Sequence, residues 1–117
     1  MLPLIYNFSA ESGLAIHLAF DFVVAETGDP IPFAGSVFAL DIRDQDGVAA
    51  ARFSTNPGGG MTLDLATGRV DWPCAAPATA GNYTYELIQI PTVGIPIPWV
   101  RGDINVKTSN TKRPEEN

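Results

Sequence analysis

The fold is decided by residues 14 to 24, which read Leu14-Ala15-Ile16-His17-Leu18-Ala19-Phe20-Asp21-Phe22-Val23-Val24. Large apolar side chains stand at every second position, with His17 and Asp21 between them. Because successive side chains of a strand point to opposite faces, this period of two predicts a β-strand with one buried face. We expect His17 to face away from four buried residues: Ile16, Leu18, Phe20 and Phe22.

Shorter alternating stretches follow, separated by residues that favour turns. We expect strands at 36–43, 48–54, 61–65, 69–72, 82–90 and 100–106. The pair Asp46-Gly47 tolerates positive φ and closes hairpins, and the stretch 56–60 holds three glycines and a proline. Residues 73–81 are rich in alanine and proline, and we expect a single helical turn there.

The number and length of these strands indicate the fold class. About seven short strands without an amphipathic helix are typical of an antiparallel β-sandwich. Tyr83 opens a late strand, where many immunoglobulin-like (Ig-like) domains place a tyrosine that pins the preceding loop. Since Cys74 is the single cysteine, no intrachain disulfide can form. We therefore predict an all-β, Ig-like sandwich without a disulfide, in which the Tyr83 hydroxyl bonds the backbone between residues 73 and 80.

The length of 117 residues suits one domain. We expect an N-terminal arm at 1–13, the β-sandwich at 14–107 and a flexible polar tail at 108–117, because the tail carries no apolar anchor.

The charge balance and hydropathy exclude several partners. Thirteen acidic residues against seven basic ones give a net charge of −6, which repels the phosphate backbone of nucleic acids. No apolar run approaches the roughly 20 residues that span a bilayer, and the first residues lack the pattern of a secretory signal. A lone cysteine suits a reducing cytoplasm.

Candidate catalytic and metal-binding residues are few. The single histidine, His17, lies on the polar side of its strand, and Cys74 has no neighbouring base or cation in the sequence. The acidic stretch 41–46 is turn chemistry rather than a calcium loop, since Ile42 and Phe53 stand where an EF-hand needs ligands. We expect no enzyme activity, no cofactor and no metal.

The unusual feature is apolar character in the connections. Residues 90–99 hold three isoleucines, a valine and a tryptophan without a charge, and residues 30–33 are similar. Clustered apolar groups in loops mark interfaces, or they fold back and cap the open ends of a sandwich. For the interface reading, the candidate residues are Phe33, Ile95, Ile97 and Trp99.

The order of several segments resembles a known group of proteins. The segments are Gly-Asp-Pro-Ile-Pro-Phe-Ala-Gly at 28–35, Ala-Leu-Asp-Ile-Arg at 39–43, Thr-Gly-Arg-Val at 67–70, Ala-Thr-Ala-Gly-Asn-Tyr-Thr-Tyr-Glu-Leu at 78–87 and Val-Arg-Gly-Asp-Ile-Asn-Val at 100–106. This layout resembles small β-sandwich virion proteins of tailed bacteriophages and prophages, including N-terminal domains of upper baseplate proteins. The likeness covers about residues 8–108.

The resemblance implies an assembly role in a capsid, tail or baseplate and brings no active-site residues with it. We therefore expect a virion structural protein, made in the host bacterial cytoplasm, that docks through apolar loops onto itself and onto neighbouring virion proteins. It would be a homo-oligomer in the particle, without nucleic-acid or membrane partners. The alternative is a carbohydrate-binding module that stacks sugars on exposed aromatic rings, with Trp72, Trp99, Tyr83 or Tyr85 as candidates.

Overall fold

The computed structural model describes residues 3–108 and contains only strands and connections. The strands are β1 (Leu4–Ile5), β2 (Phe8–Glu11), β3 (Ala15–Asp21), β4 (Val37–Asp44), β5 (Ala49–Ser54), β6 (Thr62–Asp64), β7 (Arg69–Ala75), β8 (Gly81–Ile90) and β9 (Ile97–Lys107). Within the described residues, no helix has the length and apolar character needed to cross a membrane.

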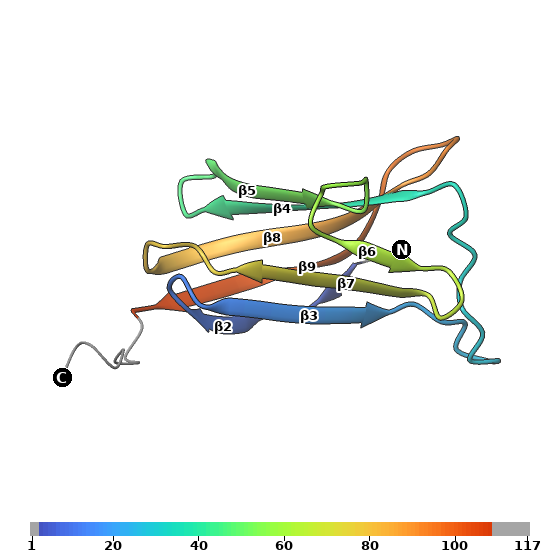
Figure 1. The fold of residues 1–117 in the computed structure, drawn as a ribbon, viewed down its shortest axis with the longest axis horizontal. Coiled ribbons are helices and arrows are strands. Elements are labelled where there is room, and N and C mark those ends of the chain that lie inside the picture. Colours follow the sequence, from blue (N-terminus) through green and yellow to red (C-terminus); the bar gives the residue numbers. More distant parts are fainter. Residues whose placement is uncertain (1–2, 109–117) are drawn as a thin grey trace.

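The strands form two sheets that face each other (Figure 1). The larger sheet has the order β1-β9-β8-β4-β5, with β2 also paired to β9, and the smaller sheet has the order β3-β7-β6. In the letters of Ig domains, the smaller sheet corresponds to strands B, E and D, and the larger one contains C′, C, F and G. The fold is therefore the all-β, Ig-like sandwich that the sequence predicts, and its body is formed by β3 to β9.

The first residues differ from the expected arm, because they belong to the larger sheet. Both β1 and β2 pair in parallel with β9, through Leu4 opposite Val100 and Phe8 opposite Ile104. Between them, the Tyr6 carbonyl accepts a hydrogen bond from the Tyr85 hydroxyl at 2.6 Å. The flexible tail was expected at 108–117, and all of it except residue 108 lies outside the described residues.

The orientation predicted for residues 16–22 is confirmed, but only one of the four apolar side chains is fully buried. Ile16 is buried, Leu18, Phe20 and Phe22 are half-buried against the core, and the His17 side chain is 67% exposed. Burial of Phe20 is incomplete because β3 lies at the edge of its sheet. The fully buried centre between the sheets is formed by side chains of Phe33, Phe38, Leu40, Ile42, Val70, Trp72, Leu87, Val100, Ile104 and Val106.

The helical turn expected at 73–81 is wrong. Strand β7 continues to Ala75, because Cys74 and Ala75 pair with Ile16 and Ala15 of β3. The local composition of alanine and proline indicated a turn of helix, but the neighbouring strand offers backbone partners that override it.

The tyrosine expected to pin the crossover does so. The Tyr83 hydroxyl donates to the Thr79 carbonyl at 2.7 Å, inside the predicted segment 73–80. Tyr85, two residues later, occupies the place of the second cysteine of an antibody domain and packs on Trp72 with ring centroids 5.8 Å apart. Aromatic packing stands where the antibody domain has its disulfide.

Replacing Tyr83 by phenylalanine tests the pinning role. We expect the free energy of unfolding to fall by roughly 0.5–1.5 kcal/mol, the net contribution of one such hydrogen bond. Urea titration followed by circular dichroism measures it. A variant as stable as the parent would show that the hydroxyl does not hold the loop.

Candidate docking surface

The connection between β8 and β9 is held at its base by a chain of side-chain hydrogen bonds. The buried Gln89 donates through Nε2 to Ser36 Oγ at 2.8 Å and accepts at Oε1 from Trp99 Nε1 at 2.9 Å. Three residues further along the chain, Thr92 Oγ1 donates to the Gly35 carbonyl at 2.6 Å. These bonds join β8, β9 and the end of the β3–β4 connection, so the base of the loop is fixed on both sides.

An aromatic cluster lies directly beneath this base. The Trp99 ring packs against Phe22 and Phe33, with centroid distances of 5.3 and 5.9 Å, and Phe33 packs edge-on against Phe38 at 4.9 Å. Phe33 is only 1% exposed. Phe33 is therefore a core residue, and its assignment to a docking surface is wrong: its loop folds back over the end of the sandwich.

The tip of the same loop has the opposite character. Val93 is 90% exposed and Ile95 is 83% exposed, the highest values among the large apolar side chains of residues 3–108. Ile97 and Trp99 are half-buried at the base. The end-cap interpretation therefore holds for Phe33, which covers the core, and Trp99 anchors the loop. Ile95 is open to solvent, so the interface interpretation stays available for it.

Further apolar side chains are exposed at the same end of the molecule. The β3–β4 connection, the β6–β7 turn and the β8–β9 loop all lie at one end of the sandwich, at the right in Figure 1. Exposed Val23 and Val24 belong to the first and exposed Leu65 to the second. We call these five side chains the apolar end: Val23, Val24, Leu65, Val93 and Ile95. Sequence reasoning placed only Ile95 among them.

Of the missed residues, Val93 had a visible signal, because it stands between Thr92 and Gly94 at the centre of an uncharged loop. Val23 and Val24 looked like the end of a strand, since they continue the alternation of β3. In the structure the strand ends at Asp21 and the chain turns, with Val24 accepting a hydrogen bond from Gly28 at 2.7 Å. That turn leaves both valines exposed.

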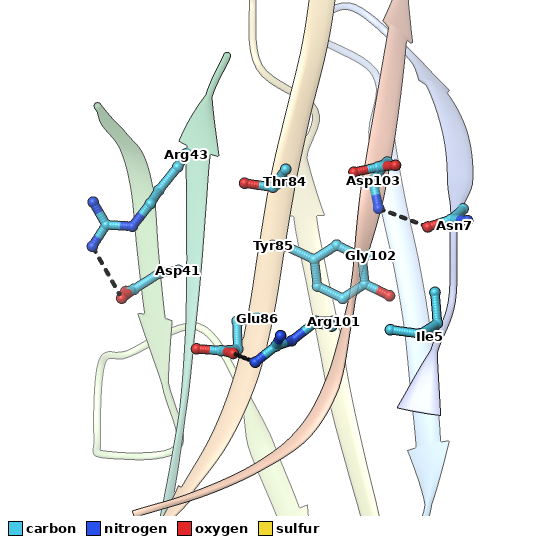
Figure 2. Close-up of a pocket in the computed structure, with 10 residues that line it drawn as sticks. All are labelled: Ile5, Asn7, Asp41, Arg43, Thr84, Tyr85, Glu86, Arg101, Gly102 and Asp103. Carbon is cyan, nitrogen blue, oxygen red and sulfur yellow. Dashed lines mark hydrogen bonds and ion pairs between the residues drawn. The ribbon is translucent and has the colours of Figure 1, made fainter. Parts of the chain in front are cut away.

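A hollow lies on the outer face of the larger sheet (Figure 2). It encloses about 570 Å³ between polar side chains of β4, β8 and β9. Its charges are largely paired: Arg101 Nη2 lies 2.7 Å from Glu86 Oε2, and Asp41 accepts from Arg52 Nε at 2.7 Å.

Three of the four aromatic residues considered for sugar stacking are buried. Trp72, Tyr83 and Tyr85 are buried, and Trp99 is half-buried against Phe22. Stacking on a sugar needs an open ring face. The three buried rings do not offer one, and Trp99 is partly covered by Phe22.

The histidine and the acidic turn considered for catalysis or metal binding lie apart from each other on the surface. His17 Nε2 lies 3.5 Å from Asp71 Oδ1 on the exposed face of the smaller sheet. Asp44 Oδ1 accepts from the backbone N–H groups of Asp46 and Val48, each at 2.9 Å, which is turn chemistry. Across residues 3–108, no group of three or more acidic, histidine or cysteine side chains is arranged to hold a metal ion.

The Cys74 thiol gives a measurable prediction. Burial raises its pKa to about 11, so the thiol is protonated at neutral pH. We expect alkylation at pH 8 to be roughly a hundredfold slower than in the denatured chain, because only the thiolate reacts. Following iodoacetamide labelling by mass spectrometry, with and without denaturant, measures the ratio. Equal rates would contradict the raised pKa of this half-buried thiol.

Comparison with known proteins adds little to this description. No family model matches the sequence, and no curated protein matches it significantly. One solved structure that aligns with the chain is Drosophila OTK, extracellular domains 3–5, with 16% sequence identity and a TM-score of 0.32. The alignment covers 91% of this chain and 33% of the OTK chain. The strand order makes the protein an Ig-like β-sandwich. Its distinguishing surface feature is the exposed apolar end.

Proposed function

We propose that this chain is a structural protein of a bacteriophage virion, which docks through its apolar end onto itself and onto neighbouring capsid or tail proteins. The observation that carries the docking role is the exposure of Val93 and Ile95 on a loop with a fixed base. The virion context is supported by the resemblance of segments 28–35, 78–87 and 100–106 to small phage β-sandwich proteins.

The fixed base matters energetically. A loop that is already ordered loses little conformational freedom on binding, so more of the burial energy appears as affinity. Burying a valine or isoleucine side chain completely contributes about 1.5–3 kcal/mol. In this proposal Gln89, Ser36 and Trp99 hold the loop in its binding conformation, and Val93 and Ile95 make the contact.

Repetition in a particle strengthens weak contacts. A docking energy of a few kcal/mol gives a weak pair in solution, but many linked copies multiply its effect.

The test uses a photo-crosslinking amino acid placed at Ile95, with Val48 as the control. Val48 is 61% exposed in the β4–β5 turn, at the other end of the sandwich. Variants are produced in cells that assemble the phage, and purified particles are irradiated. We expect crosslinks from position 95 to a capsid or tail protein or to another copy, and far fewer from position 48. Absence of the chain from the particles, or equal crosslinking from both positions, would overturn the proposal.

A further inference from the structure

Strand β3 has an open edge, whose outward main-chain groups have no strand partner among the described residues. The smaller sheet has the order β3-β7-β6, and no other strand within residues 3–108 pairs with β3. Ala76 N–H donates to the Leu14 carbonyl at 2.7 Å, and Phe22 N–H donates to the Gly68 carbonyl at 2.9 Å. Because bonded positions alternate along an antiparallel pair, even-numbered residues face β7 and odd-numbered residues face outward. The outward main-chain groups belong to Ala15, His17, Ala19 and Asp21.

This edge differs from the other sheet edges of the described chain. At seven residues, β3 is longer than the edge strands β1, β2, β5 and β6. It contains no proline, no bulge and no charged side chain that points toward the core. Proteins normally protect an edge with one of these devices, because a bare edge is a template for another strand. An unprotected edge of this length is typical of a strand that pairs with a strand of another chain.

An apolar groove of about 540 Å³ runs beside the edge, between the two sheets. Leu4, Phe20, Phe22 and Trp99 line it, and Leu4 is 61% exposed. A strand added to β3 would place every second side chain over this groove, so its inward side chains must be apolar.

The outer face of β3 is charged in a self-complementary way. The Asp21 carboxylate is bound by Arg69 through two hydrogen bonds, of 2.7 and 3.1 Å. Four positions before it in the chain stands His17, beside Asp71. If a second β3 pairs antiparallel with Ala19 opposite Ala19, each His17 lies opposite Asp21 of the other copy. Arg69 and Asp21 of one copy then lie next to His17 of the other copy, whose imidazole also approaches its own Asp71 diagonally across the strands. The two-fold axis repeats this arrangement, with an imidazole between two carboxylates each time.

We propose that β3 pairs antiparallel with β3 of a second copy, about a two-fold axis at Ala19, and joins the smaller sheets of both copies into one six-stranded sheet. On the inward face this register sets Leu18 opposite Phe20 and Ile16 opposite Phe22, which supplies the apolar side chains that the groove needs. At the axis, the small Ala19 side chains meet without a clash. The neighbouring registers lose the His17–Asp21 pairing, since an axis at His17 or Leu18 sets His17 opposite His17 or Ala19.

This surface is separate from the apolar end, so the proposal does not depend on docking to virion proteins. The test is sedimentation equilibrium of the purified chain and of two variants. Ala19→Lys sets two like charges opposite each other at the axis, whereas Ala50→Lys changes an exposed alanine of β5. We expect the parent and Ala50→Lys to dimerise and Ala19→Lys to dimerise at least tenfold more weakly. A parent that is monomeric at about 1 mM, or an Ala19→Lys variant that dimerises as well as the parent, overturns the proposal.

Crosslinking tests the register. In a Cys74→Ala background, Ala19→Cys sets two thiols opposite each other with Cα atoms about 5.5 Å apart, within the range that a disulfide spans. Ala15→Cys is the matched control, since Ala15 lies opposite Val23 in the proposed register. We expect rapid disulfide-linked dimers from position 19 and few from position 15. The reverse result, or equal yields, contradicts the register. The two proposals can fail separately. Crosslinking from position 95 in purified particles tests docking, whereas the dimer tests of the purified chain test only the pairing of β3.

Discussion

Replacing Phe33 by alanine is expected to lower the free energy of unfolding by about 3–5 kcal/mol, the loss typical of a deleted core aromatic. Phe33 is 1% exposed and touches three rings, those of Phe22, Phe38 and Trp99. Its removal opens a cavity at the base of the β8–β9 loop, where side-chain hydrogen bonds tie the loop to the end of the β3–β4 connection and oppose its inward collapse. The cavity term therefore adds to the lost transfer energy.

Phe20→Ala provides the comparison, because Phe20 is half-buried at the open edge of β3. We expect a smaller loss there than at Phe33, since part of the Phe20 side chain already contacts water in the folded chain. Urea titrations of both variants measure the difference. A Phe33 variant as stable as the parent, or less affected than the Phe20 variant, would contradict the placement of Phe33 in the core.

The sequence predicted the body of the fold well, because side-chain alternation reports directly on which face of a strand is buried. In β3 the pattern of Ile16, His17 and Phe20 could arise from few other structures. Tyr83 was predictable for a different reason: its place at the start of a late strand carries a known geometric role.

Features that depend on distant partners were not predictable from local patterns. Strands β1 and β2 are short and pair in parallel with β9, almost 100 residues away in the chain. The extension of β7 to Ala75 depends on β3 in the same way. Phe33 and Ile95 stand in similar proline-rich apolar segments, and only the path of the backbone decides that one is buried and the other exposed.

Replacing Val93 and Ile95 together by serine is expected to weaken docking by about 2–4 kcal/mol, or roughly thirtyfold to a thousandfold, for each contact. The loss comes from apolar area that is no longer buried on binding. The fold itself should change in stability by less than about 0.5 kcal/mol, because both side chains are exposed in the free chain. The anchors Gln89 and Trp99 remain in place, so the loop keeps its conformation.

The most direct test of docking through the apolar end is the number of copies of this chain per purified particle, measured by quantitative mass spectrometry. Three chains are compared: the parent, Val93→Ser/Ile95→Ser, and the control Val48→Ser, each first shown to be folded by circular dichroism. We expect the double variant to fall to a small fraction of the parent's copy number and the control to equal the parent. A folded double variant that enters particles at the parent's level would contradict it.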